Sequence, residues 1–290
     1  AMNMICIFSM INILENPSWK QGIIHGLFCG FMIDIRFMGI LLPAATLFLM
    51  ILRILFSDNR TRTSISFLIP LIVFILSTIA FTIAFWPILW LDPVFHFIQG
   101  LKEMSRFTWV STVLYRGEFI YTNKLPWHYD SLWILITTPL QYIAFFVIGI
   151  LLTMKNILSF KKDRILIFEL EFSSILLFFV PLIVIILLNS VEYDAWRHLF
   201  FLYCPLCILA VRGISEIKKK LTYYIKPTWI NISLILLTIP IALKMVEMHP
   251  YQNIYFNRIV GPDAGCAKFV YEMDYWGLAY REALEKLYLK

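Results

Sequence analysis

The residues best suited to chemistry form a cluster of an acid, a cation and an imidazole just before a long apolar run. Asp194, Arg197 and His198 lie together in Tyr193-Asp194-Ala195-Trp196-Arg197-His198. An arginine can pair with a phosphate through two hydrogen bonds, and a neighbouring histidine can donate another. The cluster therefore predicts a phosphate-binding site. The alternative is that Arg197 and His198 only anchor the chain at lipid headgroups.

A second pair of charges, Asp34 and Arg36, lies between two apolar stretches. Charges at membrane depth are costly and therefore point to function by default. In a functional interpretation Arg36 holds a phosphate and Asp34 orients it. In the structural alternative the two residues form an ion pair that caps two short helices.

The segment 91–130 combines isolated polar residues with many aromatic ones. Asp92, Glu118 and His128 are the polar candidates, and carboxylates beside aromatic rings are typical of sugar-binding surfaces. The alternative is an interfacial anchor in which Asp92 caps a helix. The aromatic residues in and beside this segment are Trp86, Trp90, Trp109, Tyr115, Tyr121, Trp127, Tyr129 and Trp133.

Several common kinds of site have no support in the sequence. No metal-ligand spacing, glycine-rich phosphate loop or nucleophile elbow occurs, so we expect no metal and no soluble-type cofactor. Cys204-Pro-Leu-Cys207 has the spacing of a redox pair, but it lies in an apolar run with no second pair, so packing is the expected role. The net charge of +6 is spread over short connectors, which argues against a nucleic-acid partner.

Composition places these residues in a membrane protein. Of 290 residues, 60% are hydrophobic and 15% charged, which is too apolar for one water-soluble core. We predict an all-α polytopic membrane protein with about 6–8 membrane segments. Two weaker stretches, Met2 to Leu14 and Gly22 to Ile33, precede the clear spans, and the glycines of the second suggest a half-span or a tilted helix. The clear spans are Met38 to Phe56, Ile65 to Trp90, Ser131 to Met154, Phe172 to Asn189, Trp196 to Gly213 and Thr228 to Val246.

The lysines and arginines of the connectors predict the orientation, because short cytoplasmic loops are enriched in them. Alternate connectors are basic, and the others, including 91–130 and 190–195, are balanced or acidic. The transmembrane domain is thus 1–246, with 91–130 forming interfacial helices in an outer loop. The tail 247–290 lies outside the membrane and opens a small periplasmic domain with an amphipathic helix. The basic connectors hold Arg53, Arg60 and Arg62 against Asp58, then Lys155, Lys161, Lys162 and Arg164, then Lys218, Lys219, Lys220 and Lys226.

Five groups of residues, taken in order, resemble a known family. They are Gly26, Gly30 and Arg36; Trp86-Pro87, Trp90 and Asp92-Pro93; Leu125-Pro126-Trp127-His128-Tyr129 with Thr137-Thr138-Pro139; Tyr193-Asp194 with Arg197-His198; and His249-Pro250-Tyr251 with Asp274-Tyr275-Trp276-Gly277. The set resembles bacterial polytopic glycosyltransferases of the GT-C fold, of the protein O-mannosyltransferase and aminoarabinose-transferase type. It extends over nearly the whole chain, and each motif alone is short.

The resemblance implies a GT-C-like helix bundle in the bacterial inner membrane. It implies a polyprenyl-phosphate sugar donor and a glycan, lipid or protein acceptor on the extracytoplasmic face. Arg197 and His198 would contact the donor phosphate, with Arg36 as a further partner. Asp92 and Glu118 would contact the acceptor or the sugar.

One departure from the family pattern concerns the catalytic carboxylate. The family carries it in the first outer loop, as general base on the acceptor, whereas no acid precedes Glu15 here. We therefore expect either a C-terminal portion that is inactive without a separate N-terminal part, or the remnant of a split or degraded enzyme. The first rival is a non-catalytic membrane subunit that binds a lipid-linked sugar. The second is a transporter or flippase, which would show inverted repeats and mid-membrane charges that the sequence lacks.

Overall fold

The chain folds into two compact units made almost entirely of helices. The computed structural model describes residues 2–56, 60–105, 109–158, 165–262 and 264–289. Unit 1 comprises residues 1–107 and 153–181, and unit 2 comprises residues 108–152 and 182–290. The predicted boundary at residue 246 divides a transmembrane domain from a tail. It does not correspond to the division between the two units, and it stays a prediction. Asp58, Lys161, Lys162 and Arg164 lie outside the described residues.

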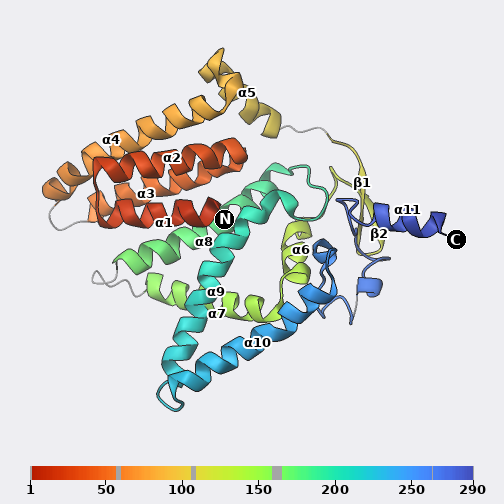
Figure 1. The fold of residues 1–290 in the computed structure, drawn as a ribbon. Helices are drawn as coiled ribbons and strands as arrows, with labels where there is room; N and C mark the ends of the chain where they lie inside the picture. The colour runs from red at the N-terminus through yellow and green to blue at the C-terminus, as the bar shows by residue number, and fades with distance from the viewer. Residues whose placement is uncertain (1, 57–59, 106–108, 159–164, 263, 290) are drawn as a thin grey trace. The chain divides into compact units, whose positions relative to one another are not determined.

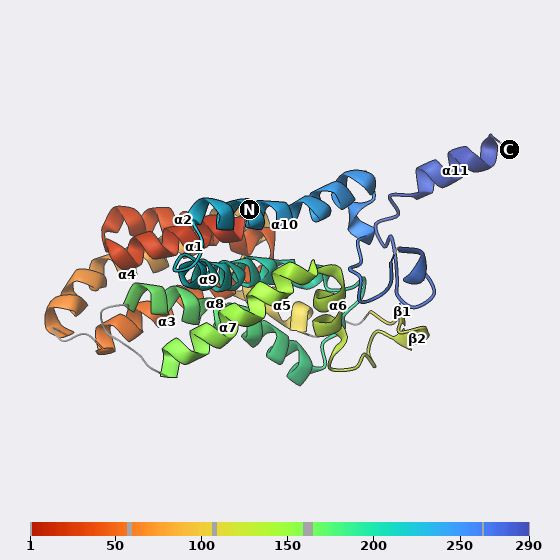
Figure 2. The same cartoon turned by 90° about the horizontal axis from the view of Figure 1, so that it is seen from below.

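Unit 1 is a bundle of apolar helices. Helix α2 contacts both α1 and α4, and α3 contacts α4, and Figures 1 and 2 show α1, α2 and α4 side by side. Its elements are α1 (Met2–Glu15), α2 (Trp19–Ile35), the 3₁₀ turn η1 (Phe37–Ile40), α3 (Leu41–Phe56), α4 (Arg60–Phe85), the 3₁₀ turn η2 (Pro87–Trp90), α5 (Pro93–Ser105) and most of α8 (Ile165–Leu188).

The glycines of α2 serve close packing and do not interrupt the helix. A Cβ added at Gly26 would lie 2.5 Å from Ser77 Cβ, and one added at Gly30 would lie 2.8 Å from Phe81 Cβ, both on α4. Gly22 repeats this contact one turn earlier, at 2.8 Å from the Pro70 carbonyl oxygen. Small residues four apart let helix backbones approach closely in membranes. The stretch Gly22 to Ile33, predicted as a half-span or a tilted helix, thus belongs to one continuous helix of 17 residues.

A buried ion pair joins α3 to α8 in unit 1. The Arg53 guanidinium donates to both carboxylate oxygens of Glu169 at 2.6 Å each, and also to the Leu14 carbonyl oxygen. The Glu169 side chain is 3% exposed. Removing one partner of such a pair leaves an uncompensated buried charge and costs about 3–5 kcal/mol. Arg53 was predicted as one cation of a cytoplasmic connector. It therefore also links α3 to α8 through this ion pair.

Unit 2 contains the remaining helices and a small hairpin. Its elements are β1 (Thr112–Tyr115), β2 (Glu118–Tyr121), α6 (Tyr129–Thr137), α7 (Leu140–Leu158), the 3₁₀ turn η4 (Arg197–Leu202), α9 (Tyr203–Leu221), α10 (Pro227–Glu247), the 3₁₀ turns η5 (Gln252–Ile254) and η6 (Ala264–Cys266), and α11 (Tyr280–Tyr288). The predicted amphipathic helix of the tail is α11.

The hairpin corrects the prediction of helices throughout the outer loop. Helix α5 fits that prediction, but β1 and β2 pair as antiparallel strands, with Tyr115 opposite Glu118. Arg116 and Gly117 form the turn, with φ of 56° and 85°. Two successive positive φ values match the twist of a two-residue hairpin turn. The flanking β-branched and aromatic residues then favour strands.

The predicted span Ser131 to Met154 is two helices. Pro139 has no N–H and forces the preceding residue out of the helical region, and Thr138 is extended with ψ of 136°. Asn257, 3% exposed, satisfies the carbonyls freed by this break. Its Nδ2 donates to the Leu135 carbonyl at 2.6 Å and to the Thr138 carbonyl at 2.7 Å.

We expect Asn257→Ala to destabilise unit 2 by about 3 kcal/mol, because two carbonyls lose their donor. Asn257→Asp should be equally harmful although the shape is kept, since a carboxylate oxygen would then face the same carbonyls. Denaturant titration in detergent micelles measures both variants. Asn123→Asp, at an exposed position, is the matched control, and equal stability of Asn257→Asp and the unaltered chain would contradict this role.

Six helices are long and apolar enough to cross a membrane among the described residues, which confirms an all-α polytopic membrane protein. Their outward faces stay uncovered: Leu76 of α4 is 61% exposed and Leu236 of α10 is 57% exposed. Apolar surface of this kind suits a bilayer. The six are Phe37–Leu55, Ser66–Phe85, Leu140–Leu158, Glu169–Leu188, Arg197–Leu221 and Pro227–Glu247.

Candidate functional site

A strained turn in unit 2 positions the predicted cluster. Asp194 and Ala195 are consecutive non-glycine residues with φ of 56° and 59°. An L residue in this left-handed region costs about 1–2 kcal/mol, and such strain tends to occur at functional sites. The turn leads into η4, whose first residue is Arg197. The backbone thus brings Asp194 back toward Arg197.

The guanidinium of Arg197 lies between a carboxylate and three aromatic rings. Its Nη1 is 2.9 Å from Asp194 Oδ2, and both side chains are about one-fifth exposed. Its Cζ lies 4.7 Å from the ring centroid of Tyr193, 5.4 Å from that of Trp276 and 5.9 Å from that of Tyr275. Partly desolvated cation–π contacts of this kind hold a guanidinium in place.

His198 completes the predicted cluster. Its Nε2 accepts a long hydrogen bond of 3.4 Å from Arg197 Nε, and its ring meets Tyr193 edge to face at 4.8 Å. Burial raises the pKa of Asp194, while the charge of Arg197 opposes that shift. The structure therefore brings together Asp194, Arg197 and His198, as their spacing predicted.

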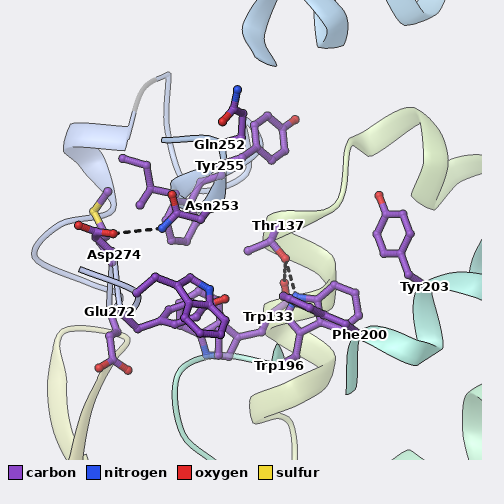
Figure 3. Close-up of a pocket in the computed structure, with 16 residues that line it drawn as sticks. Trp133, Thr137, Trp196, Phe200, Tyr203, Gln252, Asn253, Tyr255, Glu272 and Asp274 are labelled. Carbon is purple, nitrogen blue, oxygen red and sulfur yellow. Dashed lines mark hydrogen bonds between the residues drawn. The ribbon is translucent and has the colours of Figure 1, made fainter. Parts of the chain in front are cut away.

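The two further rings beside Arg197 come from a turn in the tail. Asp274, with φ of 45°, begins it. Its carboxylate accepts from the backbone N–H groups of Leu278 at 3.0 Å and Ala279 at 2.9 Å. It also accepts from Asn253 Nδ2 at 3.2 Å, and Figure 3 shows the Asp274 carboxylate turned toward that amide. These bonds fix the segment Asp274-Tyr275-Trp276-Gly277 and with it the rings of Tyr275 and Trp276.

A cavity of about 430 Å³ adjoins the turn. One wall comes from α6 and the segment around η4, where the Trp196 ring N–H donates to Thr137 Oγ1 at 2.9 Å. The other wall comes from the tail (Figure 3). The lining is mostly aromatic with a few amides and acids, notably Trp133, Trp196, Tyr255, Gln252, Asn253 and Glu272.

A second polar cluster, which the sequence interpretation missed, lies around the start of α6. Tyr129, Asp130 and Trp133 are 2%, 7% and 2% exposed. The Tyr129 hydroxyl, Asp130 Oδ1, Trp133 Nε1 and Glu272 Oε2 are all buried without a hydrogen-bond partner among the described residues. Burial raises the pKa of Tyr129, and the charges of Glu272 and Asp130 raise it further. These four side chains therefore share one buried environment, which we call the α6 cluster.

The carboxyl groups of the α6 cluster resist ionisation. Burial raises the pKa of Asp130 to about 7. Burial is also the largest cause that raises the pKa of Glu272 to about 7, with Asp194 adding to the shift and Arg197 opposing it. Glu272 thus lies within electrostatic reach of the predicted Asp194 and Arg197 pair. Both acids are single residues in aromatic segments, so no local motif singled them out.

Two other predicted residues belong to unit 2 but not to the group formed by Asp194, Arg197, His198 and the rings beside Arg197, which we call the Arg197 cluster. The Tyr115 hydroxyl and His128 Nδ1 share a hydrogen bond of 2.7 Å, and the Tyr115 ring lies 5.0 Å from that of Tyr129. His128 therefore contacts Tyr115, which in turn contacts Tyr129 of the α6 cluster. Glu118 is exposed on β2, and its role at a sugar stays a prediction.

The remaining predicted residues belong to unit 1. Asp92 Oδ1 accepts from the Phe95 N–H at 3.0 Å, which is the helix-cap geometry of the structural alternative. Both carboxylate oxygens of Asp34 are buried without a hydrogen-bond partner among the described residues. Arg36 ends α2, where its N–H donates to the Met32 carbonyl oxygen at 3.1 Å.

Unit 1 has a cavity of a different kind. It measures about 580 Å³ and is bounded by α3, α4 and α5. Its lining is almost wholly aliphatic and aromatic, including Ile40, Leu47, Ile79, Ile83, Val94 and Phe97. Such a cavity suits a hydrocarbon chain.

Comparison with known proteins places the chain in no family: no family model, curated protein or solved structure matches it. In the parts of the chain described above, no three His, Cys, Asp or Glu side chains are grouped so that they could hold a metal ion.

Proposed function

We propose that this chain binds a polyprenyl-phosphate sugar at Arg197 and transfers the sugar to an acceptor on the extracytoplasmic face of a bacterial inner membrane. The observation that carries the proposal is the Arg197 cluster, a guanidinium held by Asp194 over three aromatic rings. Arginine matches the geometry of phosphate, and partial desolvation strengthens the attraction. His198 lies beside the guanidinium, where its Nε2 accepts from Arg197 Nε, so its other ring nitrogen is the one that can donate to an anion.

The adjoining cavity supports a sugar as the group joined to that phosphate. Its volume of about 430 Å³ lies within the range of small-molecule pockets. The rings of Trp133, Trp196 and Tyr255 offer faces on which the CH groups of a sugar can stack. The side-chain amides of Gln252 and Asn253 offer donors and acceptors for its hydroxyls.

The membrane spans support a donor with a lipid tail. Arg197 is the first residue of the span Arg197–Leu221, so its charge lies at the end of an apolar helix, where the headgroup of a bilayer lipid would be found. The distribution of lysine and arginine among the connectors favours the extracytoplasmic side for this end of the helix.

The chemistry that follows is a displacement at the anomeric carbon. The acceptor's hydroxyl or amine attacks that carbon, the bond to the phosphate oxygen breaks, and the lipid phosphate leaves. Arg197 balances the charge of the leaving phosphate, which is stabilisation of the transition state by a preorganised cation. Asp194 and the three rings keep the guanidinium in position for that role.

The rival proposal is a membrane subunit that binds the lipid-linked sugar without turning it over. Transfer from a radiolabelled polyprenyl-phosphate sugar by the purified chain in lipid nanodiscs separates the two. We expect label to move to an acceptor fraction from bacterial envelopes, and a soluble nucleotide sugar to serve poorly as donor. Binding without transfer would support the subunit instead, and absence of both would refute the proposed function.

A further inference from the structure

Four buried polar groups of the α6 cluster make no hydrogen bond of normal geometry among the described residues. Buried polar atoms are nearly always hydrogen-bonded, and each exception needs an explanation. Here the exceptions are a phenol, an indole N–H and two carboxyl groups, gathered in one place. A hydroxyl group can both donate and accept, so a hydroxyl of a bound molecule would satisfy several of them at once.

The Tyr129 hydroxyl is the group that links the other three, because Trp133, Asp130 and Glu272 all act on it. The Tyr129 hydroxyl lies against the Trp133 ring nitrogen and the backbone N–H of Ala195 without making a hydrogen bond of normal geometry to either. Ala195 is the second residue of the strained turn before Arg197. The α6 cluster is therefore contiguous with the Arg197 cluster through Ala195.

Glu272 and Trp133 are the members of the α6 cluster that line the cavity, and of these two Glu272 is the one that can accept a proton. Its backbone is fixed, because its N–H donates to the Leu114 carbonyl oxygen at 3.0 Å. Figure 3 shows its carboxylate pointing away from Asn253 and Asp274, and its electrostatic neighbours are Asp194 and Arg197. Asp130, at 7% exposure, lies deeper.

We infer that Glu272 is the general base of this site and takes the proton from the acceptor's hydroxyl, while Tyr129 and Asp130 position that hydroxyl. The inference rests on the proposed function. It assigns to Glu272 the role of the catalytic carboxylate that the family resemblance led us to expect outside this chain. As the O–H bond breaks, the proton moves to a Glu272 carboxylate oxygen. The acceptor oxygen bonds to the anomeric carbon, and the electron pair of the breaking C–O bond leaves on the phosphate beside Arg197.

The burial that raises the pKa of Glu272 to about 7 supports this role, since a general base works best near the operating pH. The carboxylate form accepts the proton. The rate of transfer should therefore rise as the pH rises toward about 7 and level off above it. Tyr129, Tyr275, Asp194 and Arg197 lie within electrostatic reach of this carboxyl group, and all four should be kept intact when the profile is measured.

The test compares Glu272→Gln with the unaltered chain in the nanodisc transfer assay. Glutamine keeps the shape but cannot accept the proton, so we expect transfer to fall at least about 100-fold. Binding of the labelled donor should change less than about 2-fold, because Arg197 and the cavity remain. Glu272→Asp should retain partial transfer with a shifted pH profile, whereas Glu285→Gln, on exposed α11, should behave like the unaltered chain.

Tyr129→Phe provides a second measurement, since it removes only the hydroxyl. We expect it to raise the KM for the acceptor about 10-fold, the effect of one lost hydrogen bond to substrate. Transfer by Glu272→Gln at the unaltered rate, or with the same pH profile, would overturn the assignment of the base alone. Absence of transfer by the unaltered chain would overturn the proposed function and the assignment with it.

Discussion

Replacing Gly149 by alanine is expected to prevent unit 2 from folding stably. Gly149 on α7 faces α9, and a Cβ added there would lie 1.8 Å from the Leu209 carbonyl oxygen and 2.6 Å from its carbon. Gly213 on α9 makes the reciprocal contact, with a Cβ only 2.2 Å from the Phe145 carbonyl oxygen. Both obstacles are backbone atoms within helices, so no rotamer change can relieve them.

The expected cost exceeds that of ordinary overpacking. Inserting one methyl group into a packed core typically costs about 1–3 kcal/mol when side chains can shift. Here the two helices themselves must separate, so Gly149→Ala should cost at least about 3 kcal/mol. The yield of monodisperse protein in detergent and the midpoint of thermal unfolding measure this effect.

Gly100 of α5 is the matched control for that substitution. A Cβ added at Gly100 meets only side-chain carbons at 3.7 Å. Alanine there adds helix propensity worth up to about 1 kcal/mol, so Gly100→Ala should be neutral or slightly stabilising. If Gly149→Ala melted like Gly100→Ala, the close crossing of α7 and α9 would be wrong.

The sequence was sufficient for the membrane spans but not for how they pack. Long apolar runs predict spanning helices because the bilayer thickness sets their length. The sequence did not show why α2 contains glycines, because low helix propensity in water says nothing of the close contact with α4 that Gly26 makes. Pro139, in contrast, was a readable signal for the break between α6 and α7.

For the candidate site too, some residues could be predicted from the sequence and others could not. Asp194, Arg197 and His198 are nearly adjacent in the chain, so their spacing was enough to predict the cluster. Asp130 and Glu272 are far apart in the sequence and have no local motif. Only the fold shows that both act on Tyr129. A single sequence carries no signal for such a pairing, because burial is what makes these two carboxyl groups unusual.

Arg197→Ala is expected to weaken binding of the polyprenyl-phosphate donor about 100-fold. A charge-assisted bidentate contact to phosphate is worth about 1.5–3 kcal/mol, and 2.7 kcal/mol corresponds to that factor. Arg197→Lys should lose about 10-fold, since lysine keeps the charge but not the planar fork. Asp194 would lose its ion-pair partner in Arg197→Ala. Arg197→Lys keeps a cation beside Asp194, so it separates weaker phosphate binding from a purely structural effect.

The most direct test of the account is equilibrium binding of labelled polyprenyl-phosphate sugar to the purified chain in nanodiscs. The unaltered chain, Arg197→Ala, Arg197→Lys and Arg281→Ala are compared, the last altering an arginine whose side chain is 89% exposed. We expect unaltered affinity for Arg281→Ala and stepwise losses of about 10-fold and 100-fold for the lysine and alanine variants. Equal affinity for all four proteins would contradict a phosphate site at Arg197.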